Sequence, residues 1–392
     1  MAGLLQTSGL GSIVAHAVVA AIVGFGGTVA LVVAAAQALG ASTVQTISWV
    51  TALCLAKAVP AAWISVRYRI PAIMAWSTPG AAIIAGSSGI GFEASIGAFL
   101  LSAVLIILSG TFAGIGRLVE RIPMSIAAAM LGGVLLRFVL AAFESLPKTP
   151  ELVLPLLLVF VALRPRQPAL AVVAVLVVGV GLAAGLGLIG PGAFDQPLGT
   201  LVWTSPSFDP AVLLGLGVPL FLVTMASQNL AGFAVLRAAG YPVPASACLV
   251  GTGVASLLSA PFGAHAVNMA AITAAICSGP DAHPDPAQRW LAGPFYALTY
   301  LLFAAFAGAL IGILAALPPA LIATVAGTAL LGPLAGAVST ALAKEQERIA
   351  AIMTLAVTAS GIGVLGIGSA FWGLATGLFV LGLEALVRAR PT

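Results

Sequence analysis

The chain has 392 residues, of which 61% are hydrophobic and only 7% are charged, and its mean hydropathy is +1.17. Because soluble domains carry roughly 25% charged residues, this composition excludes a soluble protein and predicts helical membrane spans of about 20 residues. The apolar runs are continuous rather than alternating, which argues against a β-barrel. The net charge of +4 reflects loops on one side of the membrane and indicates no nucleic acid partner.

The N-terminal segment lacks the basic region of a cleavable signal peptide and continues directly into a full-length span. Cys54, Cys248 and Cys277 each lie in an apolar run and share no metal-ligand spacing. We therefore interpret the cysteines as packing residues and expect no disulfide, metal or other cofactor.

Apolar runs between proline, glycine and charged residues predict fourteen transmembrane helices in an all-α protein. The region 317–342 leaves open one long span or a broken pair. The predicted spans are 11–38, 43–66, 72–87, 92–115, 124–143, 150–163, 168–190, 211–236, 243–258, 262–278, 290–314, 318–340, 346–363 and 366–387.

The basic residues test this count. With the N-terminus in the cytoplasm, twelve fall on inside connections and only Lys148 falls outside, while Lys57 and Arg137 lie within helices. The inside residues are Arg67, Arg69, Arg117, Arg121, Arg164, Arg166, Arg237, Arg289, Lys344, Arg348, Arg388 and Arg390. Because basic residues concentrate in cytoplasmic loops, we expect both termini in the cytoplasm of a bacterium, with the protein in its inner membrane.

Fourteen spans divide into seven plus seven, which makes the second half inverted relative to the first. IPMSIAAAMLGGVLL from Ile122 matches LPPALIATVAGTALL from Leu317 at an offset of 195 residues. The tripeptide at 112–114 matches the one at 306–308 at an offset of 194. These matches predict a duplication, with repeats at 1–205 and 206–392.

The third and tenth predicted spans contain similar breaks. AWSTPGAAIIAG places Pro79-Gly80, and SAPFGAHAVNMAA places Pro261-Phe262-Gly263, before a short apolar helix of about 15 residues, which cannot cross the bilayer alone. Irregular backbone at that depth is tolerated where it lines a cavity. We therefore predict two half-helices whose N-termini meet at the membrane midplane, where their N–H groups favour an anion.

Two longer motifs resemble the benzoate/proton symporter (BenE) family. They are MASQNLAGFAVLRAAGYPVPAS, residues 225–246, and APFGAHAVNMAAITAAICSG, residues 260–279, and the likeness covers essentially the whole chain. The resemblance implies a relation to the seven-plus-seven inverted-repeat transporters, which include nucleobase and sulfate carriers. It also implies a core of helices 1–4 and 8–11, a gate of helices 5–7 and 12–14, and import of benzoate or a similar aromatic carboxylate with a proton.

The two breaks supply the first candidate substrate ligands. Their backbone N–H groups could hold a carboxylate, and Phe262 could stack on an aromatic ring. The alternative is that the glycines allow close helix packing. These candidates are Gly80, Ala81, Phe262, Gly263 and Ala264.

Polar side chains beside the breaks are further candidates. His265 could donate to a carboxylate or take up the proton, or it could be a neutral histidine bonded to a backbone carbonyl. Asn268, one turn on, would face the same side. Gln228 and Asn229 lie at the centre of the eighth helix, where adjacent amides need partners. Thr28, Ser77 and Thr78 complete the predicted substrate site.

Proton coupling has few candidates, because no acid lies within 211–236. The proton could travel on His265, on Glu93 at the outer end of the fourth helix, or on the substrate itself, and Glu93 could equally be a solvated cap. Lys57 and Arg137 are interpreted as structural, with Arg137 pairing with Glu144 or facing the boundary between core and gate.

Other functions can be compared with aromatic carboxylate import. A transporter of a nucleobase or inorganic oxyanion, or an anion channel, could use the same fold. A membrane-embedded enzyme is disfavoured, because no paired carboxylates, HExxH motif or nucleophile–base set falls within the spans. The expected partners are the carboxylate, the proton and the lipid bilayer, and the sequence leaves open a homodimer.

Overall fold

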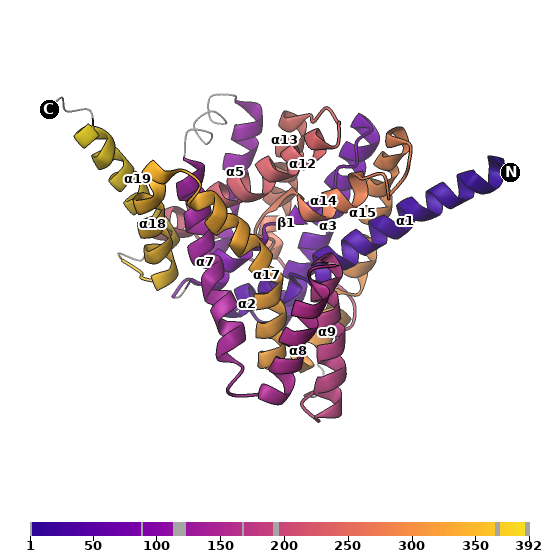
Figure 1. Cartoon of the computed structure of the whole chain (residues 1–392), viewed down its shortest axis with the longest axis horizontal. Coiled ribbons are helices and arrows are strands. Elements are labelled where there is room, and N and C mark those ends of the chain that lie inside the picture. The colour runs from indigo at the N-terminus through magenta and orange to yellow at the C-terminus, as the bar shows by residue number, and fades with distance from the viewer. Residues whose placement is uncertain are drawn as a thin grey trace.

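The computed structural model describes residues 2–87, 89–112, 123–166, 168–190, 196–364 and 369–388. Three residues of the charge count, Arg117, Arg121 and Arg390, lie outside these ranges, as does most of the 112–114 repeat match. Figure 1 shows the whole chain as a bundle of helices around a short central strand pair.

The first half of the described chain contains eight helices and one strand. They are α1 (Ala2–Gly26), α2 (Val29–Ala38), α3 (Thr43–Tyr68), β1 (Met74–Trp76), α4 (Thr78–Ala85), α5 (Phe92–Thr111), α7 (Met124–Glu144), α8 (Pro150–Leu163) and α9 (Pro168–Gly185).

The second half is more interrupted. Its first part comprises α10 (Pro210–Val212), η1 (Leu213–Gly217), α11 (Val218–Val223), η2 (Thr224–Asn229), α12 (Leu230–Ala238), α13 (Ala245–Ser259), η3 (Ala260–Phe262), β2 (Val267–Met269) and α14 (Ile272–Ser278). Its second part comprises η4 (Pro286–Leu291), α15 (Ala292–Ala305), α16 (Ala307–Ala316), α17 (Pro319–Ala341), η5 (Glu345–Glu347), α18 (Arg348–Ser360) and α19 (Ser369–Arg388).

Each of the fourteen predicted spans corresponds to one helix or one short run of elements in the described chain. By length and composition, eight described helices could cross a membrane alone, or nine if the pair α15–α16, bent by 65°, is one span. The others are short or broken. The region 317–342, left open by the sequence, is one helix, α17, with Pro333 inside it.

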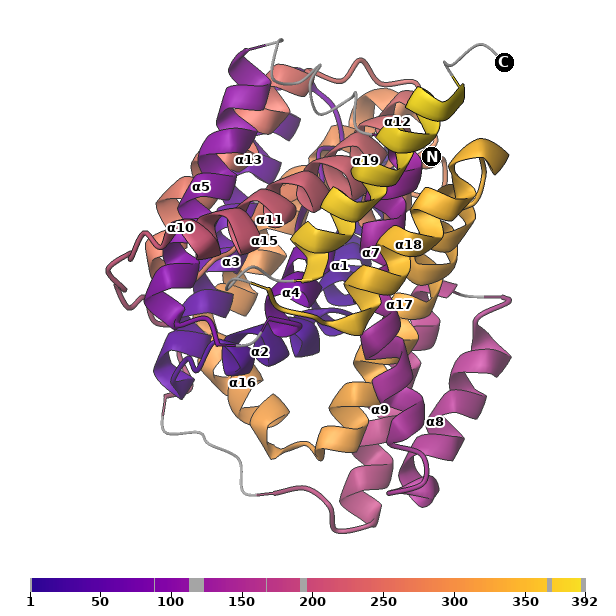
Figure 2. The ribbon, with the colours of Figure 1, turned by 90° about the vertical axis from the view of Figure 1, so that its left-hand side faces the viewer.

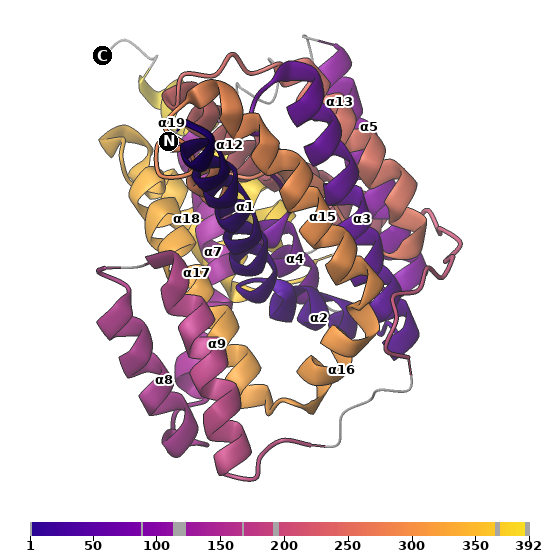
Figure 3. The ribbon, with the colours of Figure 1, turned by 90° about the vertical axis from the view of Figure 1, so that its right-hand side faces the viewer.

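The helices pack in two groups, which Figures 2 and 3 show from opposite sides. In the first group, α3 packs against α13 and α15, α13 against α5, and α1 against α14 and α15. In the second group, α7 packs against α17, α18 and α19, while α8 and α9 pair beside α17. Ser125 of α7 also donates to Glu347 of η5 at 2.5 Å.

Two short strands lie at the centre of the first group. β1 and β2 pair antiparallel, with Met74 opposite Met269 and Trp76 opposite Val267. Each strand is followed by a short helix, α4 or α14, and the strands begin 193 residues apart (74 and 267), close to the 194–195 offset of the sequence repeat. The pairing satisfies backbone groups that no helix satisfies at this point, which a chain at lipid depth requires.

Other spans are interrupted without strands. The first breaks at Gly27-Thr28, between α1 and α2. The eighth contains two π-helical turns, η1 and η2, the second of which includes Gln228 and Asn229. Such turns displace side chains from the regular helical pattern and frequently occur at functional sites.

The tenth span differs from the prediction. Its half-helix begins at Ile272 rather than beside Phe262, and Pro261-Phe262-Gly263 ends the preceding helix instead. Gly263 has φ +101°, its N–H donates to Ala260 O at 2.8 Å, and the Ala264 N–H donates to Ser259 O at 3.3 Å. This is the Schellman arrangement of a helix C-terminus, and it occupies two N–H groups predicted to hold substrate.

We expect Gly263→Ala to destabilise the fold more than Gly40→Ala. Both glycines have positive φ, so alanine at either costs about 1–2 kcal/mol from the backbone alone. A Cβ at Gly263 would also lie 2.9 Å from Trp49 Cβ, whereas nothing lies within 4 Å at Gly40. Thermal unfolding in detergent should show the larger decrease for Gly263→Ala, and equal decreases would contradict the packing of this turn.

Candidate functional site

A cavity of about 130 Å³ lies between the N-terminal ends of α4 and α14. The first group supplies most of its wall, from the α1–α2 break, α3, both strand–helix turns, η2 and α15. The second group closes it with Leu135 of α7 and Leu330 and Pro333 of α17. The cavity therefore lies at the boundary between the two groups of helices.

Lys57 of α3 contributes the one charged side chain among the described residues of this wall. It is 1% exposed, and its Nζ lies 3.6 Å from the centroid of the Tyr300 ring and 4.0 Å from that of Trp76. The Tyr296 ring lies further away, at 5.9 Å. No hydrogen bond or salt bridge joins the ammonium to another described residue, so aromatic faces are its contacts.

Hydrogen bonds fix the rings around Lys57. Trp76 Nε1 donates to Thr28 Oγ1 at 2.8 Å, Tyr296 OH to Met74 O at 2.5 Å, and Tyr300 OH to Ala21 O at 3.3 Å. Each bond ties a ring to the α1–α2 segment or to β1. The aromatic rings around Lys57 are therefore positioned by the same breaks in the helices that form the cavity.

Three of the predicted substrate ligands line the cavity: Thr28, Thr78 and Gln228. Thr28 Oγ1 donates to Gly24 O at 2.6 Å while it accepts the Trp76 bond, so its hydroxyl is already occupied. The Gln228 amide forms no hydrogen bond with another described residue, and it is partly exposed. Gln228 is thus the polar side chain best placed to contact a ligand.

Backbone N–H groups at the two half-helices add donors to the same wall. The N–H groups of Thr78, Ala271 and Ile272 have no hydrogen-bond partner within the described chain. All three residues line the cavity. The positive ends of the two short helices and Lys57 therefore face one space, which favours an anion.

The neighbouring predicted residues are scaffold. Ser77 caps α4, accepting from the Gly80 N–H at 3.1 Å and from Thr224 Oγ1 at 2.7 Å, and the Ala81 N–H donates to Ser77 O at 2.8 Å. The backbone donors of Gly80 and Ala81 are therefore used within the turn. All of these residues are buried behind the cavity wall.

The two buried asparagines hold the strand pair. Asn229 Oδ1 accepts from the Met269 N–H at 2.9 Å and so ties η2 to β2. The Asn268 amide, oriented to satisfy both its ends, accepts from the Ser77 N–H and donates to Met269 O, each at 2.9 Å. Asn268 was predicted to lie one helical turn from His265, but the segment is extended, so that prediction is wrong.

His265 is fully buried and does not line the cavity. Trp49 Nε1 donates to its Nδ1 at 3.1 Å, and its Nε2 lies 3.0 Å from Ser77 O. An indole N–H can only donate, so Nδ1 accepts and Nε2 carries the proton to Ser77. In this neutral tautomer both ring nitrogens form hydrogen bonds. His265 therefore corresponds to the alternative of a neutral histidine bonded to a backbone carbonyl.

The remaining predicted residues lie elsewhere. Phe262 packs against Trp203, with ring centroids 5.8 Å apart, and faces an apolar groove between α3 and α13. Glu93 is exposed in the first turn of α5. Neither lines the cavity between the half-helices.

The sequence interpretation missed Lys57 as a site residue. A lysine within a predicted span, far from either end, was itself a signal, because intramembrane charges are usually functional. The aromatic partners come from α15 and β1 and have no fixed spacing from Lys57 in the sequence. Their convergence could be recognised only in three dimensions.

Comparison with known proteins identifies relatives over nearly the whole chain. Residues 7–383 match the BenE family, described as benzoate membrane transport protein. The chain is 44% identical over 361 residues to the inner membrane protein YdcO of Escherichia coli (strain K12), covering 91% of this chain and 92% of that protein. It is 33% identical over 360 residues to a benzoate membrane transport protein of Acinetobacter baylyi, covering 92% and 91%.

Solved structures show the same fold at low sequence identity. The transmembrane domain of the cyanobacterial bicarbonate transporter BicA is 16% identical with a TM-score of 0.59, covering 97% of each chain. Murine Slc26a9, an anion transporter in the inward-facing state, is 12% identical with a TM-score of 0.63, covering 96% of this chain and 69% of that one. The fold is thus that of the seven-plus-seven inverted-repeat transporters, as the sequence predicted.

We expect the bond between Trp49 and His265 to contribute to stability as a pair. His265→Ala leaves the buried Trp49 N–H without an acceptor, at a cost of about 1–3 kcal/mol. Trp49→Phe in the same protein removes that donor, so the double variant should lose about 1 kcal/mol less than the sum of the single variants. Thermal unfolding of all four proteins in detergent measures this, and strictly additive losses would refute the pairing.

Proposed function

The chain belongs to the BenE family of benzoate membrane transport proteins, and on that premise we propose that it imports benzoate or a similar aromatic monocarboxylate together with a proton. The substrate occupies the cavity between α4 and α14. The observation that carries this proposal is Lys57, a buried cation without an acidic partner in the described chain, in the wall of that cavity.

The carboxylate binds at the Lys57 end of the cavity. A buried ammonium is costly without a counter-charge, and a carboxylate supplies both the charge and a hydrogen-bond acceptor. The free N–H groups of Thr78, Ala271 and Ile272 and the Gln228 amide provide neutral donors around it. Together they can replace the water that a carboxylate loses on leaving solution.

The rest of the wall suits an aromatic ring. Trp76 and Tyr296 present aromatic surfaces, while Leu135, Leu330 and Pro333 form the opposite, apolar side. An inorganic oxyanion would leave that side without a partner, and a nucleobase would need more hydrogen-bonding groups than it offers. This lining supports a carboxylate attached to a ring over the other anions considered.

Lys57 also carries the coupled proton in this proposal. The titratable groups that face it in the described chain are Cys54, one turn earlier on α3, and Tyr296 and Tyr300 on α15. A bound carboxylate stabilises the ammonium form of Lys57, and by linkage the protonated lysine binds carboxylate more tightly. Proton and substrate then move as a neutral pair, and the empty carrier returns with a neutral amine.

The movement takes place between the two groups of helices. We assign spans 1–4 and 8–11, counted in the order of the fourteen predicted spans, to a core, and spans 5–7 and 12–14 to a gate. The cavity lies at their boundary. The core shifts against the gate and exposes the cavity to one side of the membrane at a time. The charge distribution of the loops supports cytoplasmic termini.

We expect saturable uptake of labelled benzoate into proteoliposomes, driven by an inward proton gradient. Lys57→Gln keeps the length and polarity of the side chain but removes its charge. It should abolish net uptake driven by the proton gradient and raise the KM of benzoate exchange roughly 10- to 100-fold, as expected from losing a charged hydrogen bond worth about 1.5–3 kcal/mol. Uptake of an inorganic anion but not benzoate by the folded wild type would sink the substrate assignment.

The matched control is His265→Gln. Glutamine can still accept from Trp49 and donate to Ser77 O, so gradient-driven uptake should survive with KM within about twofold, because both buried hydrogen bonds are kept and the residue does not line the cavity. If His265→Gln abolishes coupling while benzoate exchange continues, the proton travels on His265 instead of Lys57.

Lys57→Arg tests the coupling itself. Arginine keeps the positive charge but cannot release its proton in proteins. The loaded carrier should still exchange internal for external benzoate, whereas net uptake driven by the proton gradient should fall to background because the empty carrier cannot return neutral. Net gradient-driven uptake by Lys57→Arg at the wild-type rate would exclude Lys57 as the proton carrier. Exchange activity in the same vesicles serves as the folding control.

A further inference from the structure

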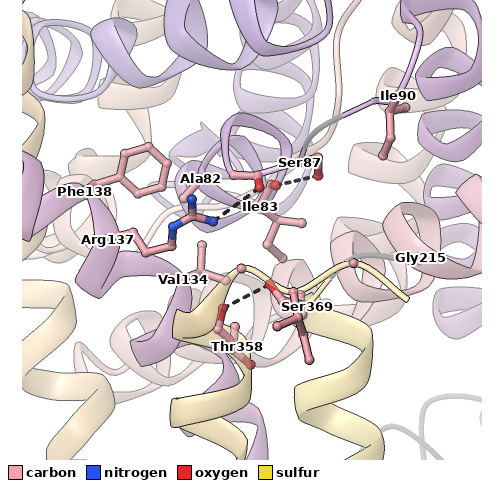
Figure 4. A pocket seen from close by; sticks show the side chains of 15 residues that line it. Ala82, Ile83, Ser87, Ile90, Val134, Arg137, Phe138, Gly215, Thr358 and Ser369 are labelled. Carbon is pink, nitrogen blue, oxygen red and sulfur yellow. Dashed lines mark hydrogen bonds between the residues drawn. The ribbon is translucent and has the colours of Figure 1, made fainter. Parts of the chain in front are cut away.

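A second cavity, of about 170 Å³, lies at the opposite end of α4 from the first. Its wall combines the C-terminal end of α4 with α7, the turn that follows α18 and the first residues of α19 (Figure 4). The cavity thus also lies between the two groups of helices. The proposed topology places it on the extracellular side.

Arg137 of α7 supplies the one charged side chain among the described residues of this wall. Figure 4 shows its guanidinium pointing toward the end of α4, where Nη1 lies 3.5 Å from Gly86 O, at the limit of a hydrogen bond. The predicted salt bridge to Glu144 is not formed, and no other hydrogen bond joins the guanidinium to a described residue. Most of its five N–H donors therefore have no partner within the described chain, and the side chain is exposed.

The guanidinium rests on Gly361. This glycine has φ +69°, and a Cβ there would lie 2.6 Å from Arg137 Nη1 and 3.0 Å from Cζ. Any other residue would displace the side chain from its place in the wall. The turn after α18 is thus shaped to receive Arg137.

The remaining wall suits a carboxylate joined to an apolar group. Ser369 and Ala370 begin the 20-residue helix α19, whose N-terminal end carries partial positive charge. Ile83, Val134 and Phe138 provide apolar surface beside the guanidinium. A planar guanidinium binds a carboxylate through two parallel hydrogen bonds, and the neighbouring Phe138 ring offers a stacking surface.

The two cavities lie near opposite ends of α4. On α7, Val134 lines the outer cavity and the next residue, Leu135, lines the central one. On α4, Thr78 lines the central cavity and Ser87, just beyond the helix, lines the outer one. An eight-residue helix is about 12 Å long, so the two cavities are separated by roughly the length of α4.

We propose that the outer cavity is a second binding site for an aromatic monocarboxylate, held by Arg137, from which substrate passes to the central cavity. This proposal rests on the proposed function, because it takes the same substrate class. Arg137 raises the local concentration of carboxylate at the boundary of core and gate. It is not needed for the proton-coupled step at Lys57.

Kinetics of benzoate uptake test the outer site. Arg137→Gln should raise KM by roughly tenfold, the effect of one lost charge-assisted hydrogen bond, and leave the maximal rate within about twofold. The wild-type KM should increase with salt, and the variant should lose most of that dependence. Arg137→Lys should be intermediate, because lysine keeps the charge but not the paired donors. Gly361→Ala should change KM in the same direction by displacing the guanidinium.

Direct binding separates this site from the central one. In a Lys57→Gln background, calorimetric titration with benzoate should still detect a weak, salt-dependent binding component, and adding Arg137→Gln should remove that component. If Arg137→Gln lowers the maximal rate with KM and salt dependence unchanged, Arg137 only links α7 to α4 and the proposal fails. Absence of saturable uptake by wild type would instead refute the proposed function, so the two failures are distinguishable.

Discussion

A chain that crosses a membrane must satisfy its backbone hydrogen bonds internally, and the broken third and tenth spans depend on one solution to that requirement. β1 and β2 pair with each other where neither span is helical. Asn229 and Asn268 then bind the ends of this pair, and His265 links Trp49 of α3 to Ser77 beyond β1. Polar residues in a 61% hydrophobic chain are therefore used first to hold the backbone. Once the backbone is held, the half-helices that follow the strands leave a few N–H groups without a partner in the described chain. These groups lie beside a cavity, where irregular backbone is tolerated at lipid depth and a polar ligand can bind.

The predictions that succeeded concern features that local sequence determines. The fourteen segments, the duplication and the half-helix beginning at Thr78 follow from hydropathy, charge and the Pro79-Gly80 signal, all of which are local. The second half-helix was misplaced because Pro261-Phe262-Gly263 carries the same residue types but ends a helix, as its Schellman bonds require. The repeat offset of 194–195 residues, applied to Thr78, would have pointed to about residue 272, where α14 begins. The local signal and the long-range repeat offset conflicted, and the repeat offset was correct.

Side-chain roles were harder to predict because burial and partners are set by distant segments. His265 and Gln228 are both polar residues near a break. His265 has both ring nitrogens occupied, whereas the Gln228 amide has no hydrogen-bond partner within the described chain. From the sequence of its own helix, Lys57 was interpreted as a structural residue. Its contacts with the rings of Trp76 and Tyr300 depend on β1 and α15, which are distant in the sequence. Sequence periodicity identifies which residues are unusual at lipid depth. It does not identify which of them retain an unsatisfied hydrogen-bonding group or charge, and that property is what binds a ligand.

Lys57 and Arg137, which form no ion pair within the described chain, differ in a way that suits different steps of the proposed mechanism. Lys57 is enclosed by aromatic rings at 1% exposure, so its charge has no solvent to stabilise it and responds strongly to a bound anion. Arg137 is exposed and permanently charged, so it can attract a carboxylate at any time but cannot couple that binding to a proton. Under the proposed mechanism, exchanging the two residue types would fail at both positions: arginine at 57 would hold its charge through the return step, and lysine at 137 would lose the paired donors. In the proposed mechanism, selectivity for a carboxylate and coupling to a proton follow from burial and residue type together, since neither property alone distinguishes the two proposed sites.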